Sequence, residues 1–224
     1  MSSTRPEAAV LVFPGTNGDR DMAESFERAG FKAVYVDSRE SVSKDAKVIG
    51  VPGGFAYGDY WRAGMLARYA PAVRALPDFV ANGGLVIGIC NGFQILVEAG
   101  LLPGALTYND PPGFRHKWVT VEVKRSIASP WLARVKPGDR LRWPMAHGEG
   151  NYYHPDGASA LADHVPFVYE RDVNGSIGRT AALLDSTGRV LGVMPHPDRA
   201  IDPHIGSTDG VRVFVGARES LDHA

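Results

Sequence analysis

The 224-residue sequence contains one cysteine, Cys90, and charges that nearly cancel. A single cysteine can form neither an intrachain disulfide nor a cysteine-rich zinc site, so we expect a cytoplasmic protein. The 24 basic and 25 acidic residues give a formal net charge of −1, which provides no overall attraction to nucleic acid or an anionic membrane. No apolar run approaches the ~18 residues of a membrane span, and residues 8–13 are too short for the apolar region of a signal peptide. We therefore expect no nucleic-acid partner and no membrane partner.

Glycine and proline, in contrast, are abundant, with 26 and 16 residues, so shaped loops take a large share of the chain. Hydrophobic residues make up 44% and charged residues 22%, which is typical of a globular domain with a sizeable core. The length is about 1.5 times the ~150 residues typical of one domain. We expect a single domain over residues 1–224.

The first half of the chain alternates apolar segments with helical ones. Strands are expected at residues 8–13, 31–37, 47–51 and 84–89. Helices are expected from about residue 19 to Gly30, at 91–99, and over 62–81 with breaks at Pro71 and Pro77. This alternation predicts the α/β class: an open, mostly parallel sheet with helices on both faces.

The spacing of apolar residues changes in the second half of the chain. Residues 118–124 and 165–170 read as half-buried strands, and residues 181–184 and 189–194 flank a turn like the arms of a hairpin. We expect these additional antiparallel strands to extend the same sheet, and residues 208–221 to form a closing helix.

Cys90 lies in a pattern typical of a nucleophile. Residues 88–92, Gly-Ile-Cys-Asn-Gly, join an apolar strand to a helical segment and match the Gly-x-nucleophile-x-Gly elbow with sulfur in place of a hydroxyl. Such an abrupt turn brings the flanking residues so close together that only glycine fits. A lone cysteine is more often a small buried apolar residue. The elbow, beside a helix N-terminus that favours a thiolate, supports the nucleophile instead.

His196 is the candidate base among seven histidines. It lies between two prolines in the segment Met-Pro-His-Pro-Asp, which follows an apolar strand, and this rigidity suits a positioned imidazole. Asp198 is two residues away and is placed to fix the tautomer of the ring, with Glu149 and Asp202 as reserve candidates. His-Pro-Asp alone reads as a capped turn. Together with the elbow, it predicts a Cys-His-carboxylate site.

Two other glycine-containing segments carry candidate polar groups. At Gly53 and Gly54, after a strand, backbone amides can face a developing oxyanion together with the amide of Asn91. His147 and Glu149 share part of a zinc-deaminase pattern, but the paired cysteines of that pattern are missing, so we expect no metal site.

Five segments of the chain resemble class I (triad) glutamine amidotransferases, and within that family the glutaminase subunits of phosphoribosylformylglycinamidine synthase. They occur in family order at residues 10–15, 51–60, 88–96, 146–153 and 194–200. The two tyrosine-containing segments distinguish this branch from its amidotransferase relatives. One departure is Asp198, where the family usually has glutamate.

The resemblance implies a flavodoxin-like fold and a glutaminase mechanism. Cys90 would be the nucleophile that forms a thioester with glutamine, His196 the base, and Gly53 and Gly54 part of the oxyanion loop, with Gln94 contacting glutamine. The ammonia released would serve the ATP-dependent conversion of formylglycinamide ribonucleotide to formylglycinamidine ribonucleotide in purine biosynthesis.

The resemblance further implies two protein partners, one a large synthetase subunit, the other a small accessory subunit. The sequence contains neither Gly-x-x-x-x-Gly-Lys-Ser/Thr nor Gly-x-Gly-x-x-Gly. We therefore expect no cofactor in this chain, with ATP and Mg on the synthetase. Two alternatives stay open: another cysteine hydrolase of similar fold, such as a γ-glutamyl hydrolase or a DJ-1/PfpI-type protein, and a noncatalytic interaction module.

Overall fold

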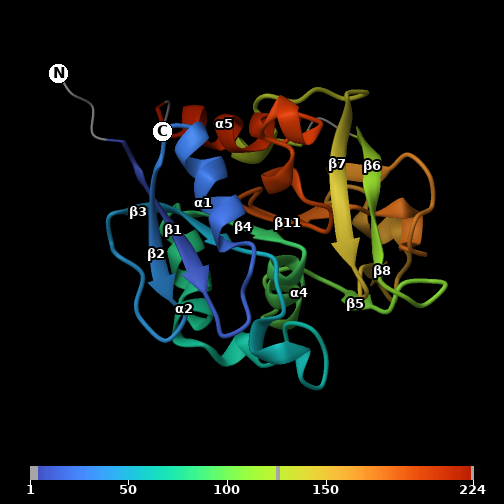
Figure 1. Ribbon diagram of the computed structural model, residues 1–224, viewed down its shortest axis with the longest axis horizontal. Coiled ribbons are helices and arrows are strands. Elements are labelled where there is room, and N and C mark those ends of the chain that lie inside the picture. The colour runs from blue at the N-terminus through green and yellow to red at the C-terminus, as the bar shows by residue number, and fades with distance from the viewer. Residues whose placement is uncertain (1–4, 125–126, 223–224) are drawn as a thin grey trace.

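The computed structural model describes residues 5–124 and 127–222, and a six-stranded sheet forms its centre (Figure 1). The strand order is β10-β11-β4-β3-β1-β2, and every pair is parallel except β10 with β11. The strands are β1 (Glu7–Val12), β2 (Lys32–Asp37), β3 (Ala46–Val51), β4 (Leu85–Ile89), β10 (Ala182–Leu184) and β11 (Val190–Val193). The five parallel strands follow the flavodoxin-like order, which confirms the predicted fold class.

Helices cover both faces of this sheet, and glycines in the strands let them approach closely. A Cβ atom on Gly50 of β3 would lie 2.2 Å from Met22 of α1 (Asp19–Arg28), while one on Gly192 of β11 would lie 2.1 Å from Phe93 of α4 (Asn91–Glu98). The α1 helix packs on α5 (Val211–Ser220) through an edge-to-face contact of Phe26 and Phe214. Figure 1 shows α1 and α5 on one side of the sheet and α4 on the other.

The antiparallel strands of the second half build separate sheets, contrary to part of the sequence prediction. The β6 strand (Arg115–Val123) pairs with β7 (Arg140–His147) and β9 (Phe167–Tyr169) in a three-stranded sheet. A two-stranded sheet joins β5 (Ala105–Thr107) to β8 (Asn151–Tyr153). The prediction that residues 118–124 and 165–170 extend the main sheet is therefore wrong, because they pair with each other and with β7. Within residues 5–124 and 127–222, the antiparallel pair that lies in the main sheet is β10 with β11.

The predicted helical segment at 62–81 is also corrected. Its α-helices are α2 (Pro71–Arg74) and α3 (Leu76–Ala81). Turns and a short 3-10 helix, Ala67–Tyr69, occupy the residues before Pro71. Pro71 begins α2 and Pro77 lies in the first turn of α3, positions where the missing N–H costs no helical hydrogen bond. In residues 5–124 and 127–222, no helix has the length and apolar character required to cross a membrane.

Candidate active site

Cys90 occupies a strained backbone position between β4 and α4. Its φ and ψ of 54° and −108° lie outside the usual regions for a residue with a side chain. The flanking glycines are required by contact: a Cβ atom on Gly92 would lie 1.8 Å from the carbonyl oxygen of Val51, and one on Gly88 would lie 2.6 Å from that of Gly92. The predicted elbow is therefore present in the structure. The Cys90 thiol points toward β7, with Sγ 3.6 Å from the carbonyl oxygen of Ala146.

His196 reaches the same edge of the sheet through the pairing of β11 with β4. Val193 lies opposite Ile89, and the backbone N–H of Cys90 donates to the carbonyl of Val193 at 2.7 Å. Beyond β11, the backbone N–H of His196 donates to Pro144 of β7 at 2.7 Å. This contact fixes His196 between the central sheet and the three-stranded sheet.

Gly53 lies directly beside both Cys90 and His196. A Cβ atom placed on Gly53 would lie 2.9 Å from Cε1 of His196 and 3.6 Å from Cβ of Cys90. The imidazole and the thiol-bearing side chain therefore meet above this glycine, and a larger residue there would intrude between them.

The carboxylate of Asp198 contacts the imidazole of His196 in the protein interior. Nδ1 of His196 lies 3.0 Å from Oδ1 of Asp198, and the two residues are only 2% and 1% exposed. Burial alone would lower the pKa of His196. The charge and hydrogen bond of Asp198, together with the neighbouring Cys90, outweigh burial and raise that pKa to about 9. The arrangement therefore stabilises the imidazolium that forms when the ring accepts a proton from the thiol.

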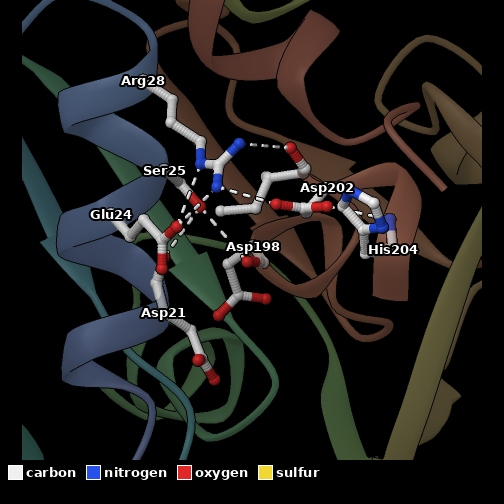
Figure 2. Close-up of polar contacts among 8 residues, drawn as sticks. Asp21, Glu24, Ser25, Arg28, Asp198, Asp202 and His204 are labelled. Carbon is white, nitrogen blue, oxygen red and sulfur yellow. Dashed lines mark hydrogen bonds and ion pairs between the residues drawn. The ribbon is translucent and has the colours of Figure 1, made fainter. Parts of the chain in front are cut away.

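The turn that carries Asp198 is held against α1 (Figure 2). Oγ of Ser25 donates to the backbone carbonyl of Asp198 at 3.3 Å, and the guanidinium of Arg28 lies 3.0 Å from Oδ2 of Asp202. Asp202 also accepts from the backbone N–H of His204. Its carboxylate is thus engaged away from the imidazole, so Asp198 is the carboxylate positioned to orient His196.

Gly53 and Gly54, which the sequence predicts to supply oxyanion amides, form a turn next to Cys90. The carbonyl of Gly53 accepts from the N–H of Gly18 at 3.0 Å, which fixes the turn, and Gly54 has a φ of 147° that suits glycine. Asn91 is the first residue of α4, and its N–H therefore has no partner within the helix.

The side chains of Asn91 and Gln94 belong to a buried hydrogen-bond network. Nδ2 of Asn91 donates to Oε1 of Gln94 at 2.9 Å and contacts Oδ1 of Asp59 at 3.2 Å, while Nε2 of Gln94 donates to the carbonyl of Glu149 at 2.7 Å. Burial and the nearby charge of Glu149 raise the pKa of Asp59 to about 6, against the hydrogen bond from Asn91. Sequence reasoning missed Asp59, although the aromatic, glycine-rich segment around it was a usable signal.

His147 is buried next to this network as a neutral ring. Burial first, and then the charges of His196 and Arg115, lower its pKa to about 3. Nδ1 of His147 lies 3.1 Å from Oδ1 of Asn109. Across the described ranges, no group of three or more His, Cys, Asp or Glu side chains is arranged to hold a metal ion.

A cavity of about 200 Å³ joins these groups at the carboxyl ends of the parallel strands. Its lining includes Asn17, Gly54, Phe55, Asp59, Cys90, Gln94, Phe114, His147, Glu149, His196 and Arg199. A small molecule in it would face the thiol of Cys90, the imidazole of His196 and the acidic residues Asp59 and Glu149 together. This set of side chains suits nucleophilic attack on the carbonyl carbon of an amide or ester.

Residues 5–209 match the model of a family described as the CobB/CobQ-like glutamine amidotransferase domain. The chain belongs to this glutamine amidotransferase family. The predicted resemblance to glutamine amidotransferases is thus confirmed. Two curated relatives of this amidotransferase carry the name phosphoribosylformylglycinamidine synthase subunit PurQ. The protein from Jannaschia sp. is 45% identical over 96% of this chain and 98% of its own, and that from Lacticaseibacillus paracasei is 44% identical over 93% and 92%.

Solved structures agree with this membership. A chain in the structure of PurLQS from Thermotoga maritima matches this amidotransferase with a TM-score of 0.90 and 40% identity, over 97% of this chain and 99% of that one. A structure described as a glutamine amidotransferase, also from Thermotoga maritima, shares the fold at 14% identity, with a TM-score of 0.63 over 96% of both chains.

Proposed function

We propose that this chain is the glutaminase subunit of a phosphoribosylformylglycinamidine synthase and that residues 1–224 form one amidotransferase domain. It hydrolyses glutamine to glutamate and ammonia and delivers the ammonia to a synthetase subunit that makes formylglycinamidine ribonucleotide from formylglycinamide ribonucleotide with ATP. The observation that carries the proposal is the Cys90, His196 and Asp198 constellation at the elbow of a chain that matches PurQ subunits over nearly its full length.

Acylation begins at Cys90. His196 takes the thiol proton, a transfer that its raised pKa favours, and Sγ attacks the side-chain amide carbon of glutamine. As the tetrahedral intermediate collapses, His196 returns the proton to the amide nitrogen, the C–N bond breaks and ammonia leaves. A γ-glutamyl thioester remains on Cys90. Water activated by His196 then breaks the C–S bond, which releases glutamate and restores the thiol.

The remaining site residues stabilise and orient this chemistry. Asp198 holds Nδ1 of His196, so that Nε2 is the nitrogen that exchanges protons. The amides at Gly53, Gly54 and Asn91 stabilise the oxyanion of the tetrahedral intermediate. Gln94, which lines the cavity, contacts the glutamine substrate.

The proposal includes a division of labour within a cytoplasmic complex. The synthetase subunit binds ATP and Mg, and a small accessory subunit completes the assembly, while this chain requires no cofactor. The structure named PurLQS and the relatives named as subunits support a complex with a synthetase. Phe55 and Phe114, which line the cavity, and Trp61, which follows in the same segment as Phe55, are exposed aromatic side chains on which such a partner would dock.

The deciding experiment measures ammonia release from glutamine by the purified chain, alone and with the synthetase and accessory subunits. Cys90→Ala should abolish release, while the complex containing this variant should still form product from free ammonium salts, because that step belongs to the synthetase. Release at the parental rate by Cys90→Ala would refute the nucleophile. Association with no synthetase at all would favour a free-standing hydrolase.

A further inference from the structure

Two carboxylates, Asp59 and Glu149, line the cavity that contains Cys90. We propose that they form a subsite for the α-ammonium group of the glutamine substrate, an inference that rests on the proposed glutaminase function. The reacting amide of glutamine must lie at the thiol, which leaves the charged amino-acid end to be recognised elsewhere in the same cavity.

Asp59 is held in place by a strained loop and by the helix of the nucleophile. Tyr57, Asp59 and Trp61 all have positive φ values, between 53° and 70°, which is uncommon for residues with side chains. The side-chain amide of Asn91, the residue after the nucleophile, contacts Oδ1 of Asp59 at 3.2 Å. The carboxylate is therefore fixed relative to Cys90 through one intervening residue.

Glu149 is tied to the same helix through its backbone. Its backbone carbonyl accepts from Nε2 of Gln94, whose Oε1 in turn accepts from Asn91. The two acidic residues are close enough for the charge of Glu149 to help raise the pKa of Asp59. Arg199, the arginine in the cavity lining, contacts Asp21. Arg62 and Arg68, which follow Asp59 in the chain, contact Glu98. A cationic group between the two carboxylates would remove their repulsion.

His147 supplies an independent indication of a ligand in this cavity. Its ring is 3% exposed and lines the cavity, and Nε2 has no hydrogen-bond partner within residues 5–124 and 127–222. Since Nδ1 lies against Oδ1 of Asn109, which also accepts from the N–H of Gly150, the proton belongs on Nδ1. Nε2 is then a buried acceptor that lacks a donor.

These three side chains share one chemical character: all accept hydrogen bonds, and two are anionic. An ammonium group has three donors and a positive charge, which complements this set. A carboxylate at the same place would be repelled. The subsite therefore selects glutamine over amides that have the same chain length but no α-ammonium group.

The test compares kcat/KM for L-glutamine and for 4-carbamoylbutanoate, which has the same reacting amide and carboxylate but lacks the ammonium group. The enzyme is assayed as the complex with its synthetase. Asp59→Asn and Glu149→Gln should each reduce kcat/KM for glutamine about 10- to 100-fold, the effect of losing one charge-assisted contact. Activity on 4-carbamoylbutanoate should stay within about twofold of the wild-type value, and Asp59→Glu should restore part of the loss on glutamine.

Asp78→Asn, which changes an exposed carboxylate on α3, is the matched control and should affect neither substrate. A folding defect in a variant would lower the rates on both substrates, so glutamine binding to Cys90→Ala with and without Asp59→Asn is measured calorimetrically as well. Equal losses on both substrates together with unchanged binding would overturn the proposal.

The ammonium ion released from glutamine carries the same charge and donors as the α-ammonium group and would bind the same acceptors. Its binding is tested by measuring inhibition with added ammonium chloride. If Asp59→Asn alters only inhibition by this salt, the subsite holds product and the proposal is wrong. If the wild-type complex releases no ammonia from glutamine, the proposed glutaminase function itself fails, and this result is separate from any result on the variants.

Discussion

Nδ1 of His196 lies 3.0 Å from Oδ1 of Asp198. The contact is made by an aspartate, whereas related amidotransferases usually have the longer glutamate at this position. A single 3-10 turn, Pro197–Arg199, follows His196 and folds the carboxylate back onto the ring. The turn is anchored at Ser25 of α1 (Figure 2). This turn places the carboxylate within hydrogen-bond distance of the ring, although the aspartate side chain is one methylene shorter than that of glutamate.

Asp198→Asn should lower kcat for glutamine hydrolysis on the order of 10³- to 10⁴-fold with little change in glutamine affinity, because the wrong tautomer of His196 is then stabilised. Steady-state kinetics and glutamine binding to the variant check this. Asp198→Glu is the matched control and should retain most activity. Normal turnover in Asp198→Asn, together with loss in Asp202→Asn, would transfer the orienting role to Asp202.

Gly92→Ala should destabilise the fold by about 1–3 kcal/mol or more, because the added methyl group would collide with the carbonyl of Val51. The free energy of unfolding in urea, followed by circular dichroism, measures the effect. Gly148→Ala is a suitable control, since its nearest neighbour would lie 3.9 Å away in Phe114. Equal urea midpoints for the two variants would show that the elbow tolerates a side chain.

His147 should make the folded state more sensitive to acid. Its pKa is about 3 in the folded protein and 6.5 without the fold, so between these values the unfolded chain binds more protons and stability falls as the pH falls. The contribution has a slope of at most about 1.4 kcal/mol per pH unit.

His147→Asn keeps a donor for Asn109 but removes this titration, so the variant should lose less stability than the wild type between pH 7 and pH 5. Urea denaturation at both pH values measures the difference. His116→Asn, at an exposed position, serves as the control. Parallel losses in the wild type and His147→Asn would contradict the buried neutral ring.

The isolated chain should be a poor glutaminase that docking activates. A coupling of ~1–3 kcal/mol would appear as about 5- to 150-fold faster glutamine turnover when the synthetase and its accessory protein are added with nucleotide and acceptor. Such coupling prevents ammonia from being released where nothing captures it. Equal rates throughout, with association demonstrated, would refute activation by the partner.

Trp61 is 82% exposed, lies in sequence between the cavity-lining residues Asp59 and Ala63, and is the leading candidate for a docking contact. Trp61→Ser should weaken association with the synthetase on the order of 10- to 100-fold while leaving the unstimulated rate unchanged. Tyr35→Ser, on the edge strand β2, is the control for losing an exposed aromatic ring. Similar dissociation constants for both variants would show that the synthetase docks outside residues 55–61.

The parallel half of the fold was predictable because each strand is a short apolar run that ends at a glycine or polar segment. The elbow was predictable for the same reason: Gly88 and Gly92 are required by contacts between neighbouring segments, so the pattern itself carries the geometry. The second sheet was not predictable in this way. Pro144 lies inside β7, and a proline within a segment argues against predicting a strand there. The β5 and β8 strands are only three residues long, too short to give a recognisable pattern.

Site residues far from the elbow depended on contacts that no local pattern encodes. Asp59 lies 31 positions before Cys90 in a loop whose conformation is unusual, and its link to Asn91 exists only in the folded chain. The unpartnered Nε2 of His147 depends likewise on Asn109, which lies 38 positions away. The periodicity of apolar residues in a sequence indicates which positions are buried. It does not indicate which polar atoms meet in the fold, such as Asp59 and Asn91, or which remain without a hydrogen-bond partner, such as Nε2 of His147.

The pairing of β4 with β11 also ties activity to the integrity of the sheet. Cys90 and His196 follow strands that are separated by about half the chain but hydrogen-bonded side by side, so their spacing is set by the backbone ladder rather than by a flexible loop. In the proposed mechanism, a chain that has not yet added β11 holds the Cys90 thiol without the His196 base and releases no ammonia. Enzyme turnover can therefore serve as a reporter of complete folding, rising during refolding only when the last parallel strand joins.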